Sequence, residues 1–104
     1  MVVVIHKNHA GKHDPARVIY IGRPSPLGNP YAIGPNISRN QAIEAYRTWL
    51  TDMIVAKNMR VMLALKHIYR LHTTGTAVLS CWCKPNACHG DVIKAYIEGD
   101  WNVS

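Results

Sequence analysis

The sequence predicts a single small α/β domain, in which a three- or four-stranded sheet packs against about three helices. Three short runs rich in β-branched and aliphatic residues, at 2–5, 17–21 and 76–82, have the length and composition of strands. Segments with apolar residues at helical spacing separate the second run from the third, and another follows the third. The 104 residues suffice for one domain over the whole chain, 1–104, with a modest core.

The composition is that of a globular protein. Hydrophobic residues make up 48% of the chain, as in ordinary folded domains, which argues against a disordered protein. No apolar run approaches the ~18 residues that a membrane span needs, and the first residues lack the basic start of a signal peptide. We therefore expect a cytoplasmic protein without membrane contact, in which the three cysteines are thiols or metal ligands and not disulfides.

The charge of the chain favours anionic partners. Twelve Lys and Arg against six Asp and Glu give a formal net charge of +6. These cations are spread along the sequence and form no run, which suits a pocket for a small anion better than a dedicated nucleic-acid arm. We expect a nucleotide-like small molecule as the partner, with nucleic acid as the alternative.

A polar segment with turn residues separates the first two strand-like runs, which could pair antiparallel or lie as neighbouring strands. Three histidines in this segment, His6, His9 and His13, come with no paired acid or cysteine. We interpret them as part of a solvated loop and not as a metal site.

A loop rich in proline and glycine, 22–30, follows the second run. Its composition excludes a helix or an ordinary strand, and its prolines hold it rigid at low entropic cost. Arg23 offers a guanidinium fork, Asn29 an amide, and Ser25 a hydroxyl that could donate to a phosphate. A plain structured turn around a buried Leu27 is the alternative. The position directly after a strand favours a binding loop.

Two helices are expected next. Ser38 and Gln41 have the spacing of a capping box, which predicts a helix from 38 to about 57. A second helical segment covers 59–71. Aromatic and methionine residues recur along both at the spacing of a buried stripe, so we interpret them as core residues and not as cofactor contacts.

The third strand-like run leads into residues 81–91, which contain all three cysteines, and the last helix is expected over 89–98. One interpretation of this loop is a zinc site, because it carries the right donor types. The donors would be Cys81, Cys83, Cys88 and His89. The spacing C-x-C followed by an adjacent Cys-His pair differs from that of common zinc fingers. A second interpretation is structural, with small cysteines filling a tight junction between strand and helix.

The third interpretation is a ligand-contacting or reactive site. The positive end of a helix dipole stabilises anions and lowers the pKa of a thiol such as Cys88. Free amides at Gly90 and Asp91 could hold a phosphate, and His89 could act as a general acid or base. Asp91 could also orient His89, bind a ribose hydroxyl or, as an equal alternative, cap the helix. Lys84 adds a cation to the same loop.

Three motifs carry a resemblance. Residues 22–30, 46–50 and 81–91 read G-x-P-S-P-L-G-N-P, Y-R-x-W-L and C-W-C-x-P-x-x-C-H-G-D. On these motifs the sequence resembles a family of small, functionally uncharacterised phage and bacterial proteins, over a core of about residues 18–97. The resemblance implies a bacterial or phage origin, with the host cytoplasm as the location of a phage protein, and it assigns no role to any motif residue.

If the strands before the two loops are parallel neighbours, their carboxyl ends bring the loops into one pocket. We expect this pocket to bind a nucleotide or another phosphate-bearing ligand. The residues expected to contact the ligand are Arg23, Ser25, Asn29, Lys84 and Gly90. Whether a reaction follows stays open. The residues of a catalytic version would be Cys88, His89 and Asp91. The alternative function is a Cys/His zinc module that binds nucleic acid, and an exposed sheet edge leaves a dimer open.

Overall fold

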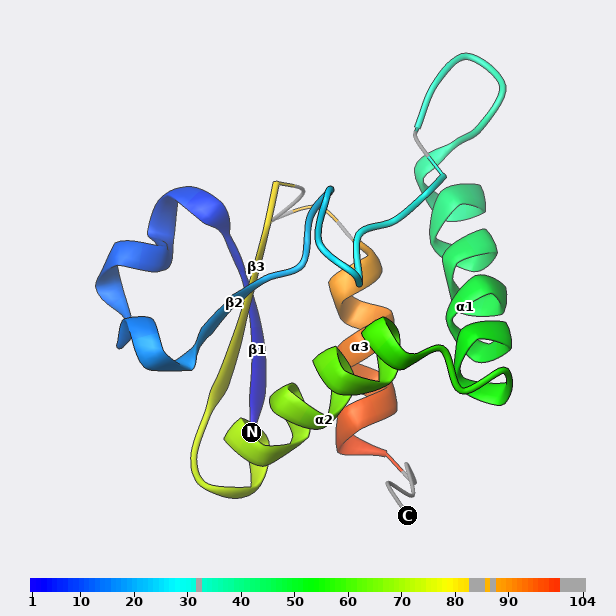
Figure 1. The fold of residues 1–104 in the computed structure, drawn as a ribbon. Coiled ribbons are helices and arrows are strands. Elements are labelled where there is room, and N and C mark those ends of the chain that lie inside the picture. Colours follow the sequence, from blue (N-terminus) through cyan, green and yellow to red (C-terminus); the bar gives the residue numbers. More distant parts are fainter. Residues whose placement is uncertain (32, 83–85, 87, 100–104) are drawn as a thin grey trace.

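The sheet has three parallel strands, β1 (Val2–His6), β2 (Val18–Tyr20) and β3 (Ala77–Cys81), as the computed structural model shows (Figure 1). The structure describes residues 1–31, 33–82, 86 and 88–99. The expected α/β class is confirmed. The spatial order is β1-β3-β2, so β3 separates the two strands at the start of the chain. Both arrangements expected for that pair, antiparallel or neighbouring, are therefore wrong.

β3 is central because it is apolar enough to be buried on both faces. All five of its residues are buried, as is usual for a parallel strand between two others. Val78 and Leu79 pair with residues of both outer strands, whereas Cys81 pairs with His6 alone. The strand-like run 17–21 forms a shorter strand than expected, because a 3₁₀ turn, η2 (Pro15–Arg17), ends directly before it.

Three helices cover one side of the sheet in Figure 1, and the 3₁₀ segments η1 (Lys7–Lys12) and η2 lie on the other. The helices are α1 (Arg39–Val55), α2 (Met59–Thr73) and α3 (His89–Glu98). The capping box expected at the start of α1 is present. The Gln41 amide donates to the Ser38 hydroxyl at 3.2 Å, and the Gln41 side chain accepts from the Ser38 amide at 2.8 Å.

The core lies between the helices and the sheet. Its largest fully buried side chains come from all three helices, from β1 and β3 and from the segment after β2. They include Ile21, Tyr46, Leu50, Leu65, Leu79 and Ile93. The aromatic and aliphatic stripe expected along α1 and α2 is therefore core. No helix in the described part of the chain is both long and apolar enough to cross a membrane.

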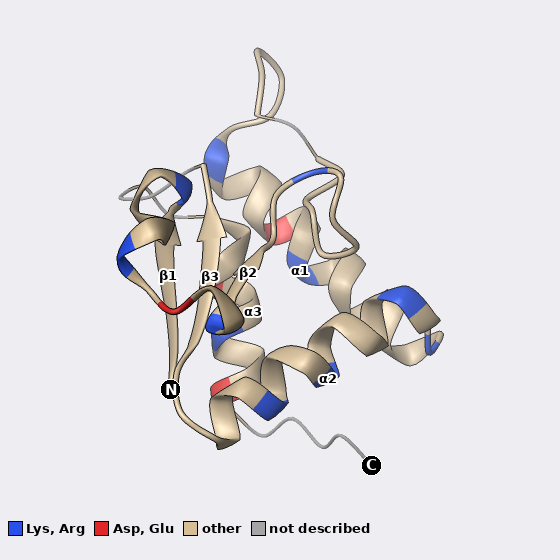
Figure 2. Ribbon diagram, turned by 60° about the vertical axis from the view of Figure 1, so that its left-hand side comes forward, with Lys and Arg blue, Asp and Glu red and all other residues tan. Residues whose placement is uncertain are grey.

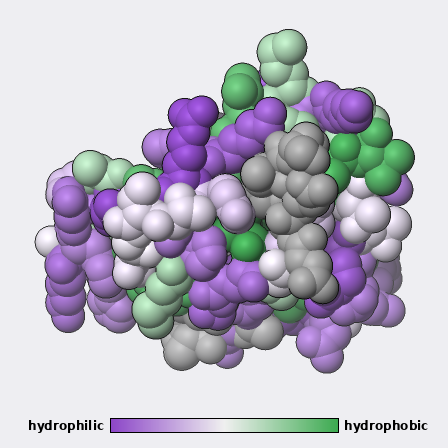
Figure 3. Space-filling model, turned by 90° about the horizontal axis from the view of Figure 1, so that it is seen from below, coloured by the Kyte–Doolittle hydropathy of each residue, from purple (hydrophilic) through white to green (hydrophobic). Residues whose placement is uncertain are grey.

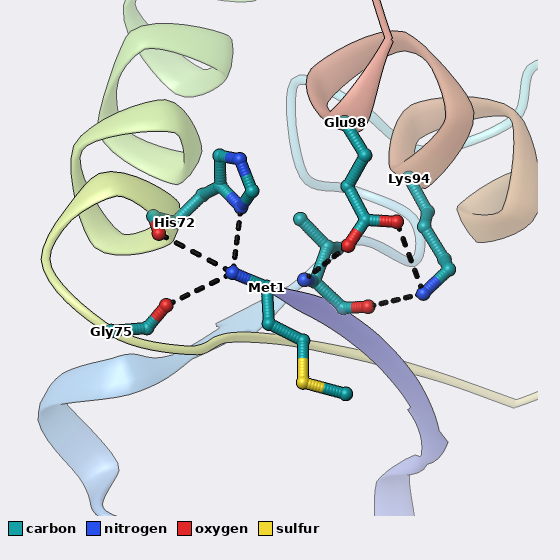
Figure 4. A network of polar contacts seen from close by, with 6 residues as sticks. Met1, His72, Gly75, Lys94 and Glu98 are labelled. Atoms are coloured by element: carbon teal, nitrogen blue, oxygen red, sulfur yellow. Dashed lines mark hydrogen bonds and ion pairs between the residues drawn. The ribbon is translucent and has the colours of Figure 1, made fainter.

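Polar contacts fix the amino end of β1 to α2 and α3 (Figure 4). The Met1 amino group lies 2.8 Å from His72 Nδ1, and the Val2 amide donates to Glu98 Oε2 at 2.9 Å. Lys94 Nζ donates to the Val2 carbonyl and pairs with Glu98 at 3.2 Å. The hydrogen bond from Val2 lowers the pKa of the Glu98 carboxyl. Hydrophilic side chains cover most of the surface at this end of the molecule (Figure 3).

Candidate functional site

A cavity of about 130 Å³ lies at the carboxyl end of the sheet, between the loop after β2, the start of α1 and the start of α3. Because β2 and β3 are parallel neighbours, the segments that follow them leave the sheet at the same edge. Arg23 and Asn29 line the cavity from the first loop, and Cys88 and His89 line it from the start of α3. The structure thus brings together residues that lie more than fifty positions apart in the sequence.

Two arginines line this cavity, and none of its described lining residues is acidic. The Arg23 guanidinium forms no hydrogen bond or ion pair within the described residues, and the side chain is exposed. Arg39, the first residue of α1, also lines the cavity. Figure 2 shows Lys and Arg positions, in blue, along the loops at the carboxyl end of the sheet. The cavity therefore presents positive charge.

The loop 22–30 packs into the core and also lines the cavity. Its Leu27 side chain is 1% exposed, and the Leu27 carbonyl accepts a hydrogen bond from the Tyr46 hydroxyl at 2.8 Å. Burial raises the pKa of Tyr46, so this hydroxyl keeps its proton. Asn29 donates to the Ala42 carbonyl at 3.3 Å and accepts from the Tyr31 amide at 2.8 Å. The buried turn and the lining role thus coexist in one segment.

Ser25 lies apart from the site. Its hydroxyl oxygen is buried and has no hydrogen-bond partner among the described residues, and it does not line the cavity. Its backbone is bonded within the loop: the Ser25 amide donates to the Gly22 carbonyl at 2.9 Å, and the Ser25 carbonyl accepts from the Gly28 amide at 2.9 Å. The side chain is therefore not placed to contact a ligand in this cavity.

His89 is a buried, neutral side chain at the cavity wall. Its Nε2 lies 2.6 Å from the Ile21 carbonyl, which can only accept, so Nε2 carries the proton. The ring meets the Tyr46 ring edge-on at 4.9 Å between centroids. Burial lowers the pKa of His89, although the hydrogen bond to Ile21 acts in the opposite direction. The ring therefore joins the start of α3 to the end of β2, and a catalytic role would fall on Nδ1.

The thiols of Cys81 and Cys88 lie 3.2 Å apart in the core beside the cavity. Their mutual hydrogen bond and then burial raise the pKa of Cys88. The expected lowering by the helix dipole is therefore wrong, because the hydrogen bond with Cys81 and the loss of solvent together outweigh it. A thiol with a raised pKa is a poor nucleophile at neutral pH.

We expect neither Cys81 nor Cys88 to react with iodoacetamide in the native protein at pH 7.5. Both thiols are 2% exposed or less, and only thiolates react readily. The protein is labelled once in its native state and once after denaturation, and mass spectrometry of its peptides measures the extent of labelling at each of the three cysteines. If Cys88 is modified as fast in the native protein as in the protein unfolded by about 6 M guanidinium chloride, the thiol pair is not buried.

No group of three metal-donor side chains exists within the described residues. Cys83, one of the four donors of the zinc interpretation, lies outside the described residues, as does Lys84. Of the remaining donors, Cys81 and Cys88 lie next to each other in space, whereas His89 donates from Nε2 to the Ile21 carbonyl.

The amides at the start of α3 are already used within the protein. The Gly90 amide donates to Cys88 Sγ at 3.3 Å, and the Asp91 amide donates to the Cys88 carbonyl at 3.0 Å. The expected phosphate cradle of free amides is therefore absent at these two positions. Asp91 accepts from the Cys88 amide at 3.1 Å, which is the capping role named as its alternative.

Sequence reasoning missed two residues of the site. The sequence did not single out Arg39, which lines the cavity as the first residue of α1. It assigned no role to Trp82 either, although this motif residue is 57% exposed and also lines the cavity. Its position directly after a buried strand, at the edge where ligands bind, is the signal that could have identified it.

A family model described as "Domain of unknown function (DUF4326)" matches residues 4–99. The matched range includes both loops and extends beyond the core of 18–97 expected from the motifs. No curated protein and no solved structure matches the chain.

Proposed function

We propose that this chain, which belongs to the DUF4326 family of unknown function, binds a nucleotide or another phosphate-bearing ligand. The ligand would lie in the cavity between loops 22–30 and 81–91. One observation carries the proposal. Arg23 and Arg39, which lie in different segments of the chain, both line the same cavity, and no described lining residue is acidic. Guanidinium groups bind phosphate oxygens through paired, charge-assisted hydrogen bonds.

The size of the cavity limits what enters it. Pockets that enclose a drug-sized ligand have volumes of about 300–1,000 Å³. The cavity here, at about 130 Å³, takes a phosphate group and leaves the rest of a nucleotide at its rim.

Binding is better supported than thiol chemistry. Cys88 is held as a thiol by its hydrogen bond with Cys81 and by burial, and Asp91 is engaged in capping α3. His89 lines the cavity with its proton fixed on Nε2, so any proton transfer to the ligand would use Nδ1. If the protein is an enzyme, His89 is the group through which it would act.

We expect Arg23→Ala and Arg39→Ala each to weaken phosphate-ligand binding by about 10- to 100-fold, since a hydrogen bond to a charged group contributes about 1.5–3 kcal/mol. Isothermal titration calorimetry with inorganic phosphate, ribose 5-phosphate and the nucleoside 5′-phosphates measures this. Arg60→Ala is the matched control, because Arg60 is exposed near the start of α2 and does not line the cavity. Failure of all these probes to bind the unmodified protein, or equal losses with Arg60→Ala, would refute the proposal.

The alternative function is a zinc module that binds nucleic acid, and it is supported by the 3.2 Å approach of Cys81 and Cys88. It requires stoichiometric zinc in the purified protein and unfolding by a chelator. It also requires nucleic-acid affinity that falls steeply with salt. Elemental analysis of the freshly purified protein decides between the two proposals.

A further inference from the structure

Trp82 stands at the carboxyl edge of the sheet, at the end of the central strand. Because β3 lies between the outer strands, the indole has the end of β1 on one side and the end of β2 on the other. His6, the last residue of β1, meets the indole edge-on at 5.8 Å between ring centroids. Tyr20, the last residue of β2, accepts a hydrogen bond from Trp82 Nε1 at 3.0 Å. Both neighbours therefore hold the ring in one orientation.

The same contacts connect the indole to the arginine loop. The Tyr20 hydroxyl donates to the Arg23 carbonyl at 3.2 Å, so a continuous chain of hydrogen bonds joins Trp82, Tyr20 and Arg23. The Tyr20 hydroxyl lies over the backbone of Gly22, at a place that a β-carbon would fill. Trp82 is thus fixed relative to the cation at the cavity wall.

The indole is held in place and still open to solvent. It is 57% exposed, although a tryptophan usually buries most of its large apolar surface. Lys7 places its ammonium over one face of the Trp82 ring, 4.7 Å from the ring centroid, so a base would stack on the opposite face. An oriented, exposed aromatic ring next to cations is the arrangement on which nucleic-acid bases stack.

We propose that Trp82 stacks against the base of a nucleoside phosphate whose phosphate lies between Arg23 and Arg39. This inference rests on the phosphate-binding function proposed above and narrows its ligand class. The cavity is too small for a whole nucleotide, so the base lies outside it. Two exposed aromatic side chains line the cavity, Tyr31 and Trp82, and Trp82 is the more exposed of the two and is held in one orientation by its ring contacts. A sugar phosphate without a base would leave this ring uncovered.

The test compares adenosine 5′-monophosphate with ribose 5-phosphate, which differ by the base alone. Stacking of one base contributes about 1–3 kcal/mol, so the nucleotide should bind about 5- to 100-fold more tightly to the unmodified protein. Trp82→Ala should remove that difference, so that the nucleotide and ribose 5-phosphate bind the variant with equal affinity. Trp82→Phe keeps a ring face and should retain most of it. Leu63→Ala, another exposed apolar side chain but on α2, should change neither affinity.

Fluorescence gives a second readout, because stacking quenches indole emission. The nucleotide should quench the emission of the unmodified protein, and the quench should be absent with ribose 5-phosphate and in Trp82→Phe. A 5′-phosphorylated single-stranded oligonucleotide identifies the source of the ligand. If the oligonucleotide binds much more tightly than the mononucleotide, the natural ligand is the phosphorylated end of a nucleic-acid strand. If the two bind equally, the natural ligand is a free nucleotide.

Equal affinity of the unmodified protein for the nucleotide and for ribose 5-phosphate would overturn the stacking role, and so would an equal loss of both in Trp82→Ala. Either result leaves the phosphate site intact if Arg23→Ala still weakens ribose 5-phosphate. If no phosphate probe binds, the proposed function fails first, and the stacking role fails with it.

Discussion

His89→Ala is expected to lower the free energy of unfolding by about 2–4 kcal/mol. The substitution leaves the buried Ile21 carbonyl without its donor and removes the ring that packs on Tyr46. Urea denaturation followed by far-UV circular dichroism at pH 7.5 measures the loss. An alanine at this position therefore tests folding before it tests any chemistry in the cavity.

His89→Gln is the matched control. Its side-chain amide nitrogen can replace Nε2 as the donor to the Ile21 carbonyl, so less than half of the alanine loss is expected. Equal stability of the alanine variant and the unmodified protein would show that His89 does not join α3 to the end of β2.

Acid should weaken the native state through the same side chain. Burial lowers the pKa of His89 in the folded protein below the value of about 6.5 that applies when the chain is unfolded. Between these two pKa values the unfolded state binds more protons, so stability is complete above about pH 6.5 and is lost as the pH falls through the folded pKa. The other five histidines are common to the protein and to His89→Gln, so the difference between their stability-versus-pH curves isolates His89. Parallel curves would contradict a buried neutral ring.

The secondary structure was largely predictable because its signals are local. Ser38 and Gln41 show the start of α1 through a capping box, and Asn58, whose side chain accepts from the Val61 amide, separates α2 from α1. The position of β3 between β1 and β2 was not predictable, because the strand order depends on which strand has both faces buried once the helices have packed against the sheet.

The place of the cavity was predictable, but not how the polar groups of the residues around it are used. Loops that follow strands signal a ligand edge, and the parallel pairing of β2 and β3 brings two such loops together. Arg39 and Trp82 were missed because their contribution depends on how a distant loop folds against them. Cys88 was expected to be catalytic and Gly90 to contact the ligand, yet the Gly90 amide donates to Cys88 Sγ at the start of α3. The local sequence shows which polar groups a segment carries, whereas burial and hydrogen bonding in the folded chain decide which of these groups remain free to bind a ligand.

Gly90→Ala is expected to lower the free energy of unfolding by about 1–3 kcal/mol. A β-carbon at this buried position would come within 2.7 Å of Val4 Cγ1 and 2.8 Å of Ile21 Cδ1, closer than such contacts occur. Alanine favours a helix over glycine by about 1 kcal/mol, but that gain is smaller than the cost of displacing two packed side chains. Urea denaturation measures the net effect, and phosphate titration of the same variant shows whether binding changes separately.

Val4→Ala distinguishes close packing from a ligand role at Gly90. It removes the methyl group nearest to the added β-carbon, so combining it with Gly90→Ala should cost less than the sum of the single changes, by about 0.5–2 kcal/mol. Ile21→Val removes the second contact, Cδ1, and should couple to Gly90→Ala in the same direction. If Gly90→Ala leaves the stability unchanged, shows no coupling with either partner and weakens phosphate binding, Gly90 contacts the ligand and close packing is not its role. Rescue by either partner instead shows that the glycine is there to let the first turn of α3 approach the sheet, which is what brings His89 to the cavity wall.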